Sequence, residues 1–182
     1  MAGLASTLPA GNLLARTADH PLKLTGYVAV CDTRFGEADR FLRGIAADAF
    51  TVTAPGADAG SVVTSLAEPL RASRPLLGLT TDATFMVAQQ MAREAGYEVR
   101  YNGVHRHRAE RLRHELEGDG RWIANLAKHL AESEDWATAL GELGGALFDD
   151  GTRRRRAVAE TRSTLAAGSP GHLVSWAMTR AA

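Results

Sequence analysis

The chain has 182 residues, of which 45% are hydrophobic and 23% are charged, as in an ordinary globular protein. This length supports one full hydrophobic core and is short for two domains. The 21 basic and 21 acidic side chains balance, so the whole chain carries no net charge that would attract nucleic acid or a membrane surface. The sequence therefore favours a single domain with no nucleic-acid partner and no transmembrane segment.

The first residues are small and apolar. Residues 1–18 are interpreted as the remnant of a secretory signal peptide, with a flexible arm or a packed first helix as the alternatives. The signal interpretation predicts export to the periplasm, and a cytoplasmic location follows otherwise. The single cysteine, Cys31, cannot form an internal disulfide and is silent on the compartment.

Strand-like and helix-like patterns alternate over residues 19–104. Strands are predicted at 23–31, near 50–54, at 75–79 and at 97–101, with helices between them. Alternation of this kind implies parallel pairing through right-handed crossovers. The predicted fold is an α/β domain over residues 19–182, with an open, wound, mostly parallel sheet of four or five strands in three layers. It would be flavodoxin-like or Rossmann-like.

The rest of the chain is predicted to be mainly helical. Residues 105–168 are assigned to helices, including one that contains the arginine run Arg153 to Arg156 and ends at Gly168. On such a helix the arginines are interpreted as a salt-bridged solvent face, with binding of nucleic acid or anionic lipid as the alternative. Residues 169–180 are predicted to form a final strand that rejoins the sheet.

The predicted sheet places its best candidate site at two loops. Ligands of open α/β sheets bind beyond the carboxyl ends of the strands, where the strand order reverses. That crevice would lie between the first and third strands. The candidate ligand-binding residues are Asp32, Thr33, Arg34, Thr80, Thr81 and Asp82.

Each loop also has a purely structural interpretation. Threonine and aspartate are common helix caps, so the second loop can begin a helix with no ligand present. Asp32 can pair with Arg34 in the first loop. Cys31, at the end of the first strand, resembles a nucleophile only in its position, and a buried small side chain is the more ordinary role.

The sequence contains no dinucleotide-binding glycine fingerprint and no P-loop, which argues against those two kinds of site, and it identifies no cofactor and no catalytic residue. His105 and His107 would share a face in an extended segment, with His114 in the next helix. These histidines are weak candidates for a metal site, because no further pair completes a ligand set. A solvated or anion-facing loop is the alternative.

Three short stretches carry a resemblance. They are "GLASTLPAG" near the start, "GLTTDATF" at Gly78 to Phe85, and "LVSWAMT" at Leu173 to Thr179. They resemble a family of uncharacterised proteobacterial proteins exported with twin-arginine signals. The resemblance implies periplasmic export and brings no activity, cofactor or site residue.

Three functions remain open at this point. The first is an exported binding or accessory module for a secreted protein partner, such as a redox enzyme, or for a small polar or anionic ligand. The second is a small hydrolase or transferase that uses the crevice. The third is a metal or ligand carrier built on the histidine loop.

Overall fold

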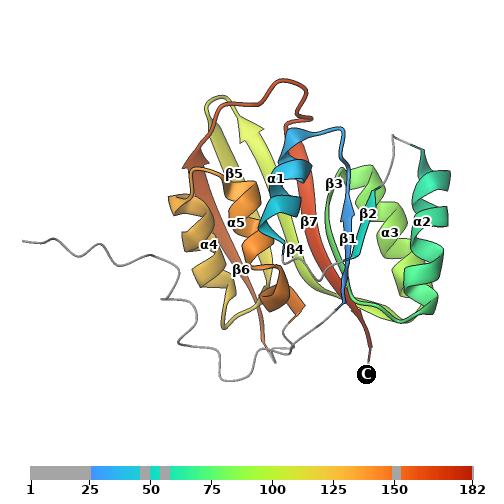
Figure 1. Cartoon of the computed structure of the whole chain (residues 1–182). Helices are drawn as coiled ribbons and strands as arrows, with labels where there is room; N and C mark the ends of the chain where they lie inside the picture. Colours follow the sequence, from blue (N-terminus) through green and yellow to red (C-terminus); the bar gives the residue numbers. More distant parts are fainter. Residues whose placement is uncertain (1–25, 46–49, 54–57, 149–152, 182) are drawn as a thin grey trace, which may run out of the picture.

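A computed structural model describes residues 26–45, 50–53, 58–148 and 153–181. The predicted signal remnant at 1–18 lies outside these residues. Within them, seven strands form one sheet in the order β2-β1-β3-β7-β4-β5-β6 (Figure 1). The parallel part consists of β1 (Val28–Cys31), β2 (Phe50–Thr53) and β3 (Leu76–Thr80). The antiparallel part consists of β7 (His172–Arg180), β4 (Tyr97–Arg108), β5 (Arg111–Asp119) and β6 (Arg154–Arg162).

The predicted fold class is therefore wrong. Only β1, β2 and β3 pair in parallel, and every pairing from β3 to β6 is antiparallel. A Rossmann-like or flavodoxin-like sheet would continue with further strand–helix units after β3. Here the chain makes a hairpin instead, and its C-terminal strand, β7, inserts between β3 and β4.

Helices were predicted over residues 105–168. The structure has strands at both ends of this range and helices between them. β4 continues beyond residue 101, where the predicted strand ended, and includes His105 and His107. A two-residue turn with Ala109 at φ 54° leads into β5, where a helix was predicted. The arginine run also lies on a strand, β6, rather than on a helix. Helices remain at α4 (Ile123–Glu132), α5 (Trp136–Glu142) and the 3-10 segment Gly144–Phe148.

A bulge in β4 lets one strand contribute to two cores. The pairing with β7 shifts between Val99 and Tyr101, so Arg100 is an extra residue in β4. Tyr97 and Val99 pack on one face of the sheet, whereas Tyr101 packs on the other.

Helices pack on both faces of the sheet, although they cover only part of one of them, as Figure 1 shows. One core lies beneath α1 (Gly36–Gly44), α4 and α5, and the other beneath α2 (Ala59–Arg71) and α3 (Asp82–Glu94). In the described ranges, no helix combines the length and the apolar character that a membrane span needs.

Two glycines fix the position of α1. A Cβ atom at Gly44 would collide with the Thr138 carbonyl oxygen of α5, and one at Gly141 would collide with the Phe41 carbonyl oxygen of α1. The two helix backbones are therefore in direct contact. This contact holds the first turn of α1, which carries the buried Glu37, against the edge of the sheet where β1 ends.

Candidate functional site

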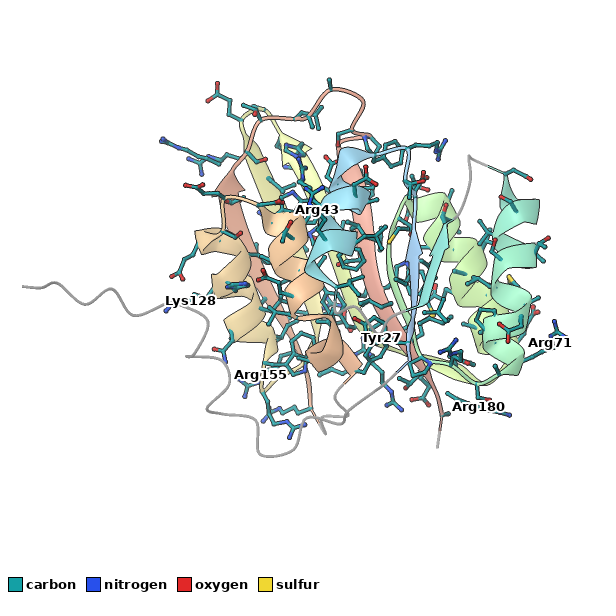
Figure 2. The ribbon with its side chains drawn as sticks, viewed as in Figure 1. Tyr27, Arg43, Arg71, Lys128, Arg155 and Arg180 are labelled. Atoms are coloured by element: carbon teal, nitrogen blue, oxygen red, sulfur yellow. The ribbon has the colours of Figure 1, made fainter. Side chains whose placement is uncertain are left out.

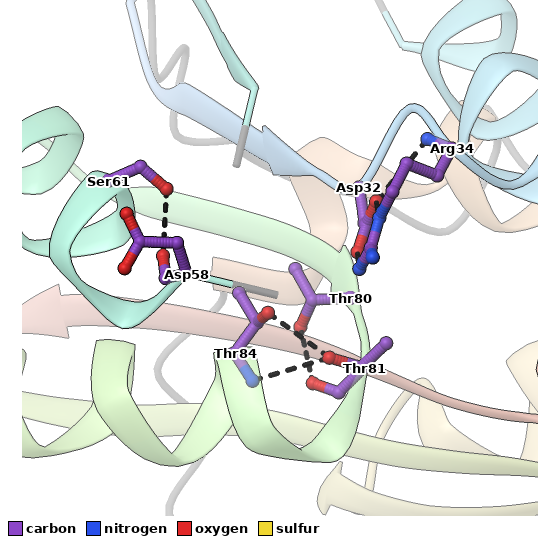
Figure 3. A network of polar contacts seen from close by, with 7 residues as sticks. All are labelled: Asp32, Arg34, Asp58, Ser61, Thr80, Thr81 and Thr84. Carbon is purple, nitrogen blue, oxygen red and sulfur yellow. Dashed lines mark hydrogen bonds and ion pairs between the residues drawn. The ribbon is translucent and has the colours of Figure 1, made fainter. Parts of the chain in front are cut away.

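The six predicted ligand-binding residues lie at one edge of the sheet. β1 and β3 are neighbours, with Cys31 paired to Leu79, so Asp32 and Thr80 follow the same end of the two strands (Figure 3). The strand order reverses here, because β2 lies on one side of β1 and β3 on the other. What the residues do at this edge decides whether they form a site.

Asp32 is engaged by Arg34. The buried carboxylate accepts hydrogen bonds from Nε of Arg34 at 2.8 Å, from its Nη2, and from its backbone N–H at 3.3 Å. Figure 3 shows the guanidinium folded back onto the carboxylate. Thr33 is exposed between them. The charge of Asp32 is thus neutralised by a residue two positions away.

The second loop is a helix cap. The Thr81 hydroxyl accepts a hydrogen bond from the Thr84 backbone N–H at 3.4 Å and lies 3.1 Å from the Thr84 hydroxyl (Figure 3). The buried Thr80 hydroxyl donates to the Thr81 carbonyl oxygen and accepts from Nε1 of Trp176, each at 3.1 Å. Asp82 is exposed in the first turn of α3. Each threonine hydroxyl therefore has a structural partner.

Cys31 is fully buried, and burial raises the pKa of its thiol to about 12. A thiolate is the reactive form of cysteine, so this side chain behaves as a small apolar group.

A cluster of histidines lies at the same edge of the sheet. His105 and His107 share one face of β4, as their spacing predicted, and His105 pairs in register with His114 of β5. His172 begins β7 and pairs in register with Arg106. Four of the six histidines of the chain therefore come from three adjacent strands.

Two of these histidines belong to a continuous hydrogen-bonded chain. Nδ1 of His105 lies 2.7 Å from Nδ1 of His114, and Nε2 of His105 lies 2.7 Å from the Ser175 hydroxyl. The Ser175 hydroxyl in turn lies 2.8 Å from the Tyr101 hydroxyl. All four side chains are buried, and the Trp136 ring packs against both imidazoles at centroid distances of 4.5 and 5.4 Å.

Both imidazoles of this hydrogen-bonded series are neutral at neutral pH. Burial lowers the pKa of His105 well below its usual range, and the neighbouring His114 and His172 lower it further. Burial also lowers the pKa of His114 to about 4. Burial raises the pKa of Tyr101 because the phenolate would be desolvated. One Nδ1 atom must carry the proton that the pair shares, since two lone pairs cannot form a hydrogen bond.

A small hollow lies beside these hydrogen-bonded side chains. The residues that line it are Glu37, His105, His107, Leu112, Trp136, Ser169, Gly171, His172 and Leu173. It leaves no space for a water molecule in this conformation. Partial burial lowers the pKa of His107, and the nearby carboxylate of Glu37 opposes that effect.

Several polar atoms around the hollow are buried and have no hydrogen-bond partner among the described residues. They are Oε2 of Glu37, Nδ1 of His107 and Nε2 of His172, together with Nε2 of His114 next to the hollow. The other carboxylate oxygen of Glu37 lies 4.0 Å from Nη2 of Arg40. An unpartnered buried polar group costs about 1–3 kcal/mol of stability. Buried polar atoms normally have partners, so this concentration of unpaired atoms is consistent with a place that a ligand, an ion or water occupies.

The described histidines do not complete a ligand set for a metal ion. The described residues include no group of three or more His, Cys, Asp or Glu side chains that could hold a metal ion. Both ring nitrogens of His105 are already engaged, by His114 and Ser175. His105 therefore has no free ring nitrogen with which to bind a metal ion.

Sequence reasoning missed most of this cluster. His114 was placed on a helix, and Glu37, His172, Tyr101 and Ser175 were not selected. One signal was available: Leu112, His114 and Leu116 alternate with charged residues at the period of a strand.

No protein-family model matches the chain, and neither the curated proteins nor the solved structures contain a significant match to it. The argument for function therefore comes from the site alone.

Proposed function

We propose that the chain is a binding module for a small ligand that donates hydrogen bonds, and that the hollow beside His105 is its site. One observation carries this proposal. Three of the residues that line one hollow, Glu37, His107 and His172, carry buried polar atoms without a hydrogen-bond partner among the described residues, and the hollow lies at the edge where parallel strands end.

The chemistry of the lining favours a small organic ammonium ion. Glu37 supplies a carboxylate oxygen without a hydrogen-bond partner, and no lysine or arginine is among the lining residues. The neutral imidazoles can present lone pairs, and a charged donor forms stronger hydrogen bonds than a neutral one. Trp136 adds an aromatic wall next to these groups.

Ligand entry requires the closed hollow to open. Ser169 and Gly171 belong to the connection between β6 and β7 and form one of its walls. Gly171 has φ +68°, a conformation that glycine adopts without strain. We expect this connection to move when a ligand binds. Among the described residues that line the hollow, only Ser169 and Gly171 lie outside the helices and strands.

The catalytic alternative at the β1–β3 crevice has less support. Asp32 is bound by Arg34, and Thr80 and Thr81 are bound within the protein. Export to the periplasm and association with a secreted protein stay proposals. Subcellular fractionation of the producing cell tests export, and recovery of the chain solely in the cytoplasm would rule it out.

Titration with methylammonium, guanidinium and ethanolammonium, followed by NMR of the histidine ring protons, tests the binding site. Saturable shifts of the His107 and His172 signals are expected for at least one of these cations. Glu37→Gln keeps the shape of the side chain and removes its charge, so it should weaken binding about tenfold or more, as expected for a charge-assisted hydrogen bond.

Glu68→Gln, at an exposed position on α2, is the matched control and should bind like the wild type. Acetate should give no saturable shift. The absence of a saturable response to all three cations, or equal binding by wild type and Glu37→Gln, would contradict the proposal. A response to zinc alone would restore the metal alternative in its place.

A further inference from the structure

On one face of the sheet, no helix in the described part of the chain covers the half that contains β5 and β6. The core beneath α2 and α3 contains residues of β1, β3, β7 and the start of β4, and none from β5 or β6. On β5, Leu112, His114 and Leu116 are buried beneath the opposite helices, so the residues between them point to the uncovered side. We call the side chains of β4, β5 and β6 that point this way the open face.

Arginine dominates the open face. Arg111 and Arg113 of β5 pair with Glu160, and Arg154 and Arg156 of β6 pair with Glu117. Within the run Arg153 to Arg156, Arg154 and Arg156 are therefore alternating residues of β6 that point to the open face. Arg106 and Arg108 of β4 and Arg162 of β6 are exposed as well, and no carboxylate in the described ranges forms an ion pair with any of these three.

The strand register places these cations directly opposite one another. Arg108 pairs with Arg111, which pairs with Arg162, so one row across three strands is entirely arginine. In the next row, Arg106 lies opposite Arg113. Like charges directly across a sheet destabilise it, so this arrangement is unfavourable unless an anion lies on it. The whole chain is neutral, which makes the concentration of charge local.

We propose that the open face is the docking surface for an acidic segment of a partner protein, held by Arg106, Arg108 and Arg162. The row of arginines spans about 10 Å, which three or four extended residues cover. An acidic polypeptide can place its carboxylates over the unpaired arginines and away from Glu115, Glu117 and Glu160 on the same sheet.

Nucleic acid fits this surface less well. Its phosphates are evenly spaced and would meet the glutamates between the arginines. Binding of single strands also uses aromatic platforms, and the uncharged residues on the open face are Asn102, Val104 and Val158. A protein partner therefore accounts for both the charges and the missing aromatic rings.

The test is fluorescence anisotropy with a labelled oligoglutamate peptide at low ionic strength. We expect saturable binding that added salt weakens. The triple variant Arg106→Ala/Arg108→Ala/Arg162→Ala should bind about fivefold to tenfold more weakly, because each exposed charge contact contributes a small increment. These side chains are exposed and their removal relieves repulsion between like charges, so the variant should unfold at a temperature no lower than that of the wild type.

A matched control removes three cations elsewhere. Figure 2 labels Arg43, Arg71 and Lys128, which lie on α1, α2 and α4. Replacing all three by alanine should leave peptide binding within about twofold of the wild type. An equal loss in both triple variants, or no binding by the wild type, would overturn the proposal. Tighter binding of oligothymidylate than of oligoglutamate would assign the surface to nucleic acid instead.

Discussion

Acidification from about pH 7 to about pH 5 should lower the free energy of unfolding markedly, because the folded chain holds two histidines neutral. His114 has a pKa of about 4 in the folded protein, against 6.5 for an unperturbed histidine. The unfolded chain therefore binds a proton at a pH where the folded chain does not. The stability that His114 contributes is complete above pH 6.5 and is lost as the pH falls toward 4.

The expected loss from His114 alone is about 2 kcal/mol by about pH 5, at about 1.4 kcal/mol per pH unit. His105 acts in the same direction, since its pKa is also lowered. Urea unfolding at a series of pH values measures the slope. His114→Gln removes one titrating group and should give a shallower slope, whereas His129→Gln, on the partly exposed side of α4, should keep the slope of the wild type. Equal slopes for wild type and His114→Gln would show that the buried pair is not neutral.

Trp176→Ala should cost about 3–5 kcal/mol of unfolding free energy, the range for removing a buried aromatic side chain. Trp176 is fully buried in β7, and its indole lies over Gly78 of the adjacent strand, where a Cβ atom would collide with the ring. Phe85 packs on it at a centroid distance of 6.1 Å. Chemical denaturation followed by circular dichroism measures the loss.

Thr80→Val separates the two interpretations of the loop after β3. The Thr80 hydroxyl accepts the hydrogen bond of the Trp176 indole, so valine would leave that N–H unpartnered and cost about 1–3 kcal/mol. Thr81→Val, which removes only the half-buried cap of α3, should cost about 1 kcal/mol. If Thr80→Val is as stable as the wild type, the hydroxyl has no structural role and is free for a ligand.

The strand–helix alternation before β4 could be predicted because each element there has a clear period. The burial of Val28, Ala29, Val30 and Cys31 in succession matches the continuous apolar run of a parallel strand. The edge at which Asp32 and Thr80 meet follows from this alternation. The sequence could not show that the Asp32 carboxylate and the Thr80 hydroxyl are already hydrogen-bonded. That depends on where the fold places their partners, Arg34 and Trp176.

The antiparallel half was mispredicted for identifiable reasons. Asn102-Gly103 is a common turn pair, but both residues lie inside β4. A glycine is needed at position 103 because the Tyr101 and Ser175 hydroxyls occupy the space that a Cβ atom would need. Leu112 and Leu116 are four residues apart, a spacing that suits one face of a helix as well as one face of a strand. Helix-forming residues such as arginine, glutamate and alanine in β5 and β6 favoured the helix, and tertiary pairing overrode that propensity.

The bulge at Arg100 has a consequence for how β4 tolerates change. Alternation normally assigns every second side chain to the same face, but here the assignment reverses once, after Val99. Loss of Arg100 would restore regular pairing and leave Tyr101 and His105 on their present sides. Loss of one residue between Tyr101 and His105 would instead turn both His105 and His107 away from Glu37 and toward solvent. The histidine cluster therefore depends on the number of residues in this strand as strictly as on their identity, because removing the bulge residue preserves it and removing a residue between Tyr101 and His105 destroys it.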